Sequence, residues 1–312
     1  MLTNLLIVLP IFALILTGWI ARRTNALGPH ATREVNRFVV WLALPALLFD
    51  IMASATPSEI WQPGFILAFS AGAGTVFALT LALRMRQGRG LADAGIDALN
   101  ASYPNTGYMG VPLMLAIVGP EALAVTLVSI ILTVCVLFGV AIACIEAGLQ
   151  SQSHHSNIAR QTFLALVRNP LIVAPAAGTV VMITGLPLPD PLARFLDLLG
   201  GAASPCALIA LGLFLADSAG RRLESDRGTA AMLMGFKLLL QPALTWVVAA
   251  LILRLPPETT HMVVILSALP TGTGPFMLAE YYGRGALITA RVVLATTILS
   301  ILTLSAYLAV TG

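Results

Sequence analysis

The chain has few charged residues for its length. Of its 312 residues only 10% are Asp, Glu, Lys or Arg, and 58% are hydrophobic, whereas a soluble domain is about 25% charged and about 45–50% apolar. A soluble fold could not bury so large an apolar fraction. The shortage of charge therefore excludes an ordinary soluble protein and indicates a chain whose surface faces a lipid bilayer.

Lysine is nearly absent, which bears on enzymatic function. Lys237 is the single lysine among the 17 cationic residues, and it follows Phe236. A phosphate-binding Walker loop requires Gly-Lys followed by Ser or Thr, so ATP-driven pumping within this chain is excluded. The sequence also lacks a nucleophile elbow and a zincin motif. We therefore predict a protein that is not an enzyme and that needs no cofactor.

Residues that bind metals are scarce as well. The three cysteines, Cys135, Cys144 and Cys206, lie inside apolar runs without the spacing of a metal or redox motif, which is typical of small core residues. His154 and His155 are adjacent but have no third ligand nearby. We predict no metal site.

Long apolar runs, by contrast, are abundant. A helix needs about 20 apolar residues to cross a hydrocarbon core about 30 Å thick. Runs of roughly this length cover residues 2–21, 38–54, 62–83, 98–120, 122–145, 171–189, 198–216, 229–253, 259–279 and 292–312. We therefore predict an all-α, multi-pass integral membrane protein of about ten transmembrane helices.

The arginines suggest the topology. Lys and Arg concentrate in cytoplasmic loops, and here they fall mainly in the odd-numbered connections between the predicted helices. This pattern predicts that both termini are periplasmic, and it explains the excess of cations without a nucleic-acid partner. A chain rich in Arg and Ala with one Lys is typical of a GC-rich bacterial genome, so we expect it in the bacterial inner membrane.

A polar stretch divides the chain near its middle. Residues 148–169 contain no spanning run and are interpreted as a cytoplasmic linker between residues 1–147 and 170–312. With five spans in each half, the second half must enter the membrane with the opposite orientation. This arrangement is an inverted repeat.

Two proline motifs recur between the halves. Leu44-Pro-Ala-Leu in the second predicted helix resembles Ser204-Pro-Cys-Ala in the seventh, and Pro104-Asn-Thr-Gly in the fourth resembles Pro270-Thr-Gly-Thr in the ninth. The two separations are 160 and 166 residues. Two matches at nearly one period, in corresponding helices, support the repeat.

The fourth and ninth predicted helices cannot be regular throughout. Proline removes a backbone donor and glycine has a poor helix propensity, so each helix should open into two half-helices near mid-bilayer. A half-helix that begins at the break presents free N–H groups and the positive end of its dipole, which favours an anion. The candidate binding residues are Pro104, Asn105, Thr106, Gly107, Pro270, Thr271, Gly272 and Thr273. The alternative is a pair of proline kinks without a ligand.

These motifs carry a resemblance to a known family. They are Asn36-Arg-Phe-Val with Leu44-Pro-Ala-Leu, Pro104-Asn-Thr-Gly-Tyr-Met-Gly-Val-Pro-Leu113, Leu211-Gly-Leu-Phe-Leu-Ala216, and Ala268-Leu-Pro-Thr-Gly-Thr-Gly-Pro-Phe276 with Glu280-Tyr281. Over essentially its whole length the chain resembles the auxin efflux carrier family of secondary transporters. The strings in helices four and nine are the specific ones.

The resemblance implies a fold and a function. The fold is the crossover fold shared with bile-acid symporters, often as a homodimer, and the substrate lies at the crossing of helices four and nine in an elevator-type mechanism. Bacterial members of this kind are associated with malonate or related small carboxylates, and plant members with indole-3-acetate. In plant members the asparagine at the position of Asn105 contacts substrate, but a glutamine stands where this chain has Thr271. That departure argues against an aromatic substrate and favours a small organic anion.

Ionisable residues inside predicted spans are costly and need an explanation. Lys237 could attract an anion or pair with an acid, or it could snorkel to the cytoplasmic headgroups. Asp50 could be interfacial, or it could take up a proton or help to bind Na⁺. Asp93, Asp97 and Asn100 share one helix face; we expect the aspartates to be solvated and Asn100 to hydrogen-bond another helix.

Two other transport classes remain open. A Na⁺-coupled organic-anion symporter of the bile-acid type would share the crossover architecture, but it needs clustered acidic and amide ligands, and Asp50 is the obvious acid nearby. A channel or sensor would need a continuous polar lining, whereas the polar residues within the spans gather at two breaks.

Overall fold

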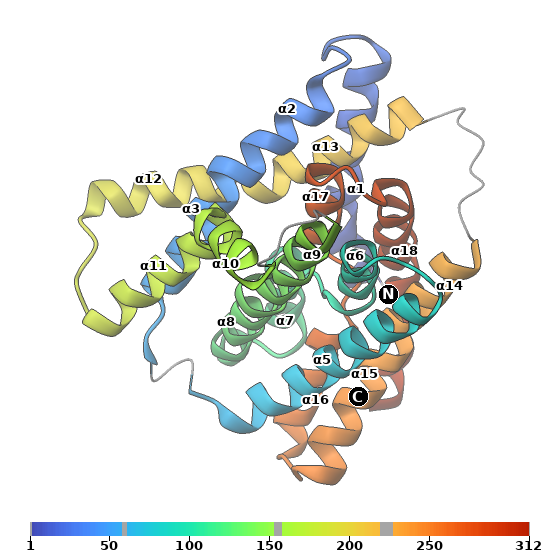
Figure 1. Cartoon of the computed structure of the whole chain (residues 1–312). Coiled ribbons are helices and arrows are strands. Elements are labelled where there is room, and N and C mark those ends of the chain that lie inside the picture. The colour runs from blue at the N-terminus through green and yellow to red at the C-terminus, as the bar shows by residue number, and fades with distance from the viewer. Residues whose placement is uncertain (1, 58–60, 153–157, 219–226, 312) are drawn as a thin grey trace.

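The computed structural model describes residues 2–57, 61–152, 158–218 and 227–311. These residues form helices joined by short connections, with no strand among them (Figure 1). Six helical segments in the described ranges are long and apolar enough to cross a membrane: Ala31–Ser54, Pro63–Arg86, Pro120–Ser151, Asp190–Asp217, Arg227–Ile252 and Ala286–Val310. Thr106–Ile117 and Pro170–Thr184 are shorter apolar helices. The architecture is consistent with an all-α integral membrane protein.

Most helices lie within the predicted apolar runs. In the first half they are α1 (Leu2–Arg23), α2 (Ala31–Phe38), α3 (Leu44–Ser54), α5 (Pro63–Arg86), α6 (Leu91–Ser102), α7 (Val111–Ile117), α8 (Leu123–Ile130) and α9 (Phe138–Gln152). In the second half they are α10 (Ile158–Arg168), α11 (Pro170–Thr184), α12 (Asp190–Gly201), α13 (Ala203–Ser218), α14 (Arg227–Gly235), α15 (Gln241–Trp246), α16 (Pro257–Ala268), α17 (Gly274–Tyr281) and α18 (Ala286–Thr311). The exceptions are α2, α10 and most of α6 and α12, which lie outside those runs. The predicted linker contains the end of α9 and all of α10; His154 and His155 lie outside the described residues.

Short π-helical segments precede three of the prolines. They cover Val39–Ala43, Thr106–Gly110 and Phe236–Leu240, and Pro45, Pro112 and Pro242 each follow two residues later. Proline lacks an N–H and its ring clashes with the carbonyl of the preceding turn. The wider π turn accommodates this clash, so the helices around Pro45 and Pro242 continue through the proline.

The helices fall into two groups. α1 packs along α13, and α3 packs along α11 and α12; most of this first group lies at the upper left of Figure 1. α5, α6, α9 and α14 to α18 pack among themselves as the second group. The candidate site lies where the two groups meet.

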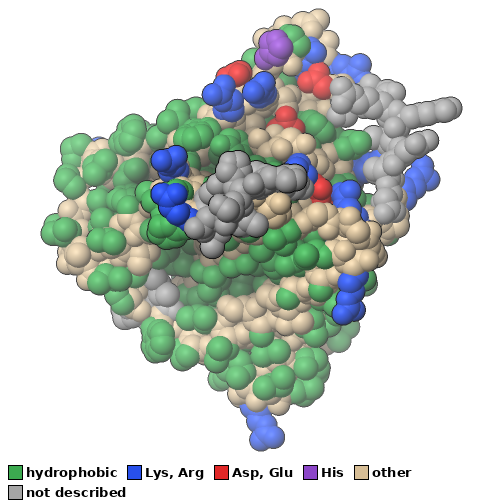
Figure 2. All heavy atoms as spheres, viewed as in Figure 1, with side chains coloured by type: hydrophobic (Ala, Val, Ile, Leu, Met, Phe, Trp, Pro, Cys, Tyr) green, Lys and Arg blue, Asp and Glu red, His purple; other side chains and the backbone are tan. Residues whose placement is uncertain are grey.

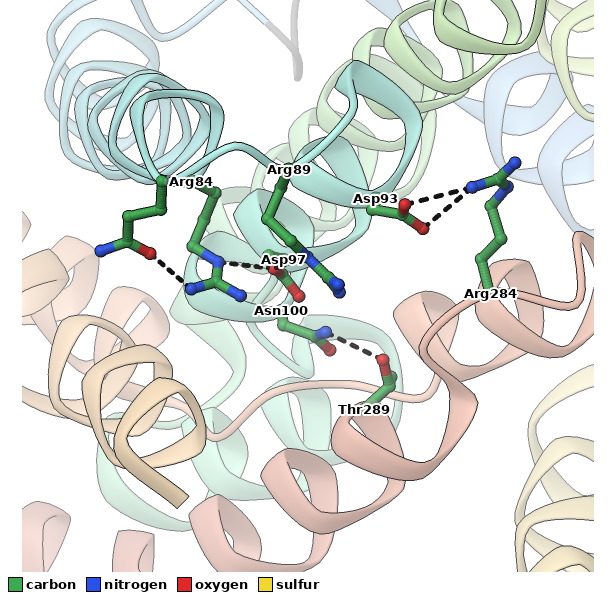
Figure 3. Close-up of polar contacts among 8 residues, drawn as sticks. Arg84, Arg89, Asp93, Asp97, Asn100, Arg284 and Thr289 are labelled. Atoms are coloured by element: carbon green, nitrogen blue, oxygen red, sulfur yellow. Dashed lines mark hydrogen bonds and ion pairs between the residues drawn. The ribbon is translucent and has the colours of Figure 1, made fainter. Parts of the chain in front are cut away.

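A polar cluster fixes the start of α6 (Figure 3). Asp97 is 1% exposed, and its carboxylate accepts a hydrogen bond of 2.8 Å from Nε of Arg84 on α5. Asp93 pairs at 3.1 Å with Arg284, which precedes α18. The prediction that both aspartates are solvated was therefore wrong for Asp97. A buried carboxylate needs a partner of opposite charge, and Arg84 provides it. The expected contact of Asn100 is confirmed: its Nδ2 donates to Thr289 Oγ1 at 2.9 Å.

Candidate functional site

Both predicted breaks are present, and they contact each other. α6 ends at Ser102 and helix resumes at Thr106, whereas α16 ends at Ala268 and α17 starts at Gly274. The segments between them pair in antiparallel fashion at Pro104 and Thr271. The Asn105 N–H donates to the Pro270 carbonyl at 2.8 Å, and the Gly272 N–H donates to the Tyr103 carbonyl at 3.1 Å. Each break thus satisfies backbone groups that the other exposes.

Thr271 stabilises this crossing by hydrogen bonds. Its hydroxyl donates to the Asn100 carbonyl at 2.9 Å, and its N–H donates to Thr296 Oγ1 at 3.1 Å. The side chain is fully buried. Pro270, Thr271 and Gly272 therefore connect the second break to the first and to α18, and none of them lines the cavity described below.

A cavity of about 300 Å³ adjoins the crossing. Tyr103 to Tyr108 of the first break form one wall, with Thr273 and Met277 of the α17 segment. The other lining residues come from α3, from the end of α8 and the π-helical segment Ile131–Leu137 that follows it, and from the α12–α13 junction: Leu44, Leu47, Ile51, Ile130, Val134, Gly200, Gly201, Ala203 and Ser204. The cavity is therefore shared between the two helix groups, and no lining residue is charged.

Two polar side chains of the first break have unused hydrogen-bonding capacity. The Asn105 amide makes no hydrogen bond within the described part of the chain, and it lines the cavity. The Thr106 hydroxyl is buried, also without a partner there. Buried polar groups of native proteins are nearly always hydrogen-bonded. A ligand with hydrogen-bond acceptors in this cavity would satisfy donors of both side chains.

Backbone N–H groups add to these donors. The Thr106 N–H bonds the Pro104 carbonyl, and the Met109 and Gly110 N–H groups both bond the Asn105 carbonyl. The N–H groups of Gly107 and Tyr108, in the first turn of the second half-helix, have no partner in the described ranges. The positive end of this half-helix therefore lies at the cavity wall.

The Tyr103 ring fixes the distance between the breaks. It packs against the Phe138 ring in a tilted arrangement, with the ring centroids 5.7 Å apart. It also lies so close to the second break that a Cβ on Gly272 or Gly274 would meet it at 2.9 Å or 2.7 Å. Only glycine permits this approach. The Gly-Thr-Gly string therefore has a packing role, besides its poor helix propensity.

Replacement of Gly274 by alanine tests that packing. The new methyl would overlap the Tyr103 ring and approach Phe138 to 3.0 Å, so we expect a loss of about 1–3 kcal/mol of stability, typical of overpacking. Thermal unfolding of the purified protein measures it. Gly235→Ala is the matched control, because its Cβ would meet nothing within 4 Å. Equal unfolding temperatures for the two variants would contradict the packing role.

The two ionisable residues singled out from the sequence lie elsewhere. Lys237, in the π segment between α14 and α15, is fully buried and donates from Nζ to the Ser267 carbonyl at 2.8 Å. It neither snorkels nor pairs with an acid within the described residues. Asp50 is half-buried on α3, accepts a hydrogen bond from Ser54, and does not line the cavity.

Several lining residues escaped the sequence reasoning. Ser204, Gly200 and Gly201 enter from the α12–α13 junction, and Tyr103 and Tyr108 flank the first break. The signal for Ser204 was its place beside Pro205, in the motif that repeats Leu44-Pro45. The tyrosines were part of the recognised string but were not selected as site residues.

Comparison with known proteins identifies the family. A family model described as "Membrane transport protein" matches residues 5–308. The chain is 31% identical to a protein named "Putative malonate transporter" from Rhizobium meliloti (strain 1021), over 97% of this chain and 94% of the relative. It is 25% identical to an uncharacterized transporter of Escherichia coli (strain K12), over 88% and 87%. With auxin efflux carrier component 8 of Arabidopsis thaliana it shares 24% identity, over 88% of each chain. The chain is therefore a membrane transporter of the membrane transport protein family, which is the auxin efflux carrier family.

Proposed function

We propose that this protein is a secondary active transporter of a small organic anion, malonate or a related carboxylate, which binds in the cavity at the crossing of the two helix breaks. The observation that carries the proposal is the set of unused donors in that cavity: the Asn105 amide, the Thr106 hydroxyl and the N–H groups of Gly107 and Tyr108. A carboxylate accepts hydrogen bonds from all three kinds of donor.

The cavity favours an anion of small size. Its lining contains no carboxylate that would repel an anion, and a half-helix N-terminus supplies positive potential. Its volume of about 300 Å³ is at the lower end of ligand pockets, which span roughly 300–1,000 Å³. A Na⁺ site would need several oxygen ligands with acids among them, and none of the lining residues is acidic. This favours carboxylate transport over the Na⁺-coupled alternative.

The proposal includes the ten-span inverted repeat. If spans one to five correspond to spans six to ten, a contact of span one with span seven must recur as a contact of span six with span two. α1 of span one packs on α13 of span seven, and α11 of span six packs on α3 of span two, which supports the repeat. The two breaks lie 166 residues apart, so the repeat maps Pro104 onto Pro270, one residue before Thr271. The bridge between Pro104 and Thr271 therefore joins two positions that nearly correspond to each other in the repeat. Helices four and nine then cross near mid-bilayer, as transporter folds of this kind do.

The mechanism proposed is an elevator movement of a homodimer in the bacterial inner membrane. The first helix group would be the fixed scaffold and the second the moving transport domain. The position of the cavity between them supports this, since a relative shift would expose the bound anion to the other side. Cationic side chains gather toward the top of Figure 2, above a largely hydrophobic surface, and this supports a cytoplasmic face at that end with both termini periplasmic.

Asn105→Ala tests the binding site directly. We expect wild-type protein in detergent to bind malonate or a related small carboxylate, and the variant to bind it at least about tenfold more weakly, because one charge-assisted hydrogen bond contributes roughly 1.5–3 kcal/mol. Isothermal titration calorimetry with a panel of mono- and dicarboxylates measures both.

The matched control for this experiment is Asn25→Gly. Asn25 carries an exposed amide outside the cavity, and glycine keeps its positive φ of 55°. Unchanged affinity in Asn105→Ala would contradict the site, and absence of binding for every carboxylate tested would contradict the substrate class.

A further inference from the structure

We propose that Lys237 is the proton carrier of this transporter, so that anion binding at the crossing and protonation of Lys237 favour each other and the anion moves together with a proton. The inference rests on the proposed function, since it assigns a coupling ion to the proposed carboxylate transport.

Lys237 lies at the negative end of a half-helix. Its single hydrogen bond goes from Nζ to the carbonyl of Ser267, in the last turn of α16 just before the second break. Cations at a helix C-terminus are stabilised by the free carbonyls and the dipole. An ammonium has three N–H groups, so two of them remain without a partner in the described residues.

No counter-charge accompanies this lysine in the part of the chain that the structure describes. The elements packed against its segment are α5, α6, α16 and α18, besides the adjoining parts of its own helix. The ionisable residues of these four helices are Arg84, Arg86, Asp93, Asp97, Glu258, His261, Arg291 and Tyr307, and α14 begins at Arg227. Both aspartates are paired with arginines, His261 contacts Tyr307, and Glu258 lies in the first turn of α16, at the opposite end from Ser267. None of these groups pairs with Lys237.

An uncompensated buried ammonium costs several kcal/mol. The negative end of α16 offsets part of this cost, and an anion held nearby would offset more. Protonated Lys237 in turn makes the site more favourable for an anion. Because such coupling free energies are reciprocal, binding either the proton or the anion raises the affinity for the other.

A short chain of bonded groups connects Lys237 to the cavity. Ser267, which accepts its hydrogen bond, is three residues before Pro270. The Pro270 carbonyl accepts from the N–H of Asn105, whose side chain lines the cavity. Lys237 thus donates to the last turn of α16, and the segment that directly follows this turn accepts a hydrogen bond from Asn105.

Orphan polar groups next to Lys237 offer a path for the proton. Gln241 and Thr245 follow at successive helical turns. Both amide atoms of Gln241 and the hydroxyl of Thr245 are buried and have no partner among the residues that the structure describes. Asn100 Oδ1 on the adjacent α6 is in the same state. Buried polar groups of this kind are commonly satisfied by internal water. In the proposed cycle the Lys237 amine takes one proton from the side of higher proton concentration and releases that proton, with the anion, on the other side.

The experiment uses full-length protein in liposomes and radiolabelled malonate. For wild type we expect an imposed pH gradient, acid outside, to drive accumulation of malonate in the liposomes. A pH dye inside the liposomes should report the entry of about one proton for each anion taken up, after subtraction of the signal recorded without a gradient. Lys237→Arg keeps a permanent charge because arginine stays protonated. We expect it to retain malonate counterflow but to lose gradient-driven accumulation at least tenfold. Lys237→Met, which removes the charge, should show uptake that is independent of the pH gradient.

The outcomes separate the two proposals. Wild-type counterflow without any response to a pH gradient would overturn the proton carrier and leave carboxylate transport intact. Gradient-driven accumulation at the wild-type level in Lys237→Arg or Lys237→Met would also overturn the proton carrier. Loss of counterflow in a monodisperse Lys237→Arg protein would overturn it too, because that result would assign the lysine to anion binding alone. No counterflow of any carboxylate by wild type would contradict the proposed function itself. The wild-type dye measurement stands even if neither variant folds.

Discussion

Replacement of Gly107 by leucine is expected to lower carboxylate uptake at least about a hundredfold, equivalent to roughly 2.7 kcal/mol, in a protein that still folds. Gly107 lines the cavity, and a Cβ at this position meets nothing within 4 Å. We therefore expect the leucine side chain to fill part of the proposed anion site and to cover the N–H groups of the half-helix that have no partner among the described residues. Uptake of radiolabelled carboxylate into liposomes measures the effect, with size-exclusion chromatography as the check on folding.

A matched control separates filling of the cavity from the cost of a larger residue in a helix. Gly74 on α5 is exposed, and a Cβ there also meets nothing within 4 Å. Gly74→Leu should transport at nearly the wild-type rate, because its side chain extends away from the protein. Equal uptake by Gly107→Leu and wild type would show that the anion does not pass this cavity.

Arg84→Ala is expected to lower stability more than any other substitution described above, by about 3–5 kcal/mol, the usual cost of removing one partner of a buried ion pair. Asp97 is 1% exposed, and Arg84 Nε is its nearest cation at 2.8 Å, with Arg89 farther away at 3.9 Å. Without Arg84 the carboxylate stays buried and largely uncompensated. The start of α6, which precedes the first break, then loses its anchor to α5 (Figure 3). Thermal unfolding in detergent measures the loss.

Arg37→Ala serves as the control for that measurement. Arg37 pairs with Glu34 at 3.7 Å, and both side chains are more than half exposed. Exposed pairs contribute little to stability, so the unfolding temperature should hardly change. A similar decrease in both variants would mean that burial of the Arg84–Asp97 pair has no special importance.

Local chemistry made the breaks predictable. Proline next to glycine and a small polar residue, in the middle of an apolar run, leaves few conformations except an opened helix, and both breaks lie where that reasoning put them. The helix bounds were predictable only in part. About ten spans were predicted, and six segments of the described chain are long and apolar enough to cross a membrane. The apolar run 38–54 lies in a helix that already begins at Ala31, because a helix can continue through polar residues beyond its apolar run. The Asn100 contact was also predictable, because Asn100 shares a helix face with Asp93 and Asp97 but comes later in the helix, inside the apolar run 98–120.

Which residues of the two breaks line the cavity and which stabilise the crossing could not be predicted. Thr271 and Thr273 have similar sequence contexts, yet Thr271 is hydrogen-bonded within the crossing and Thr273 lines the cavity. An extended segment has no helical periodicity from which side-chain directions follow, so tertiary packing decides them. The same holds for Gly200, Ser204 and Leu44, which reach the cavity only because α3 and the α12–α13 junction are packed against it.

The partner of Lys237 was also beyond the sequence. Snorkelling and pairing with an acid were the natural expectations for a lysine in a span, and both concern side chains or headgroups. The structure instead provides a backbone carbonyl at the end of a half-helix 30 residues away in the sequence. Asp97 illustrates the converse, since its burial depends on how closely α5 and α6 pack.

Counterflow is the most direct test of transport through the crossing. Liposomes that contain the purified protein and are loaded with unlabelled malonate or another small mono- or dicarboxylate are diluted into a trace of the labelled compound, and label uptake is followed over time. The account predicts transient accumulation of label for at least one small carboxylate, abolished in Gly107→Leu and absent from protein-free liposomes. No accumulation for any carboxylate of the panel, or equal accumulation in Gly107→Leu, would contradict it.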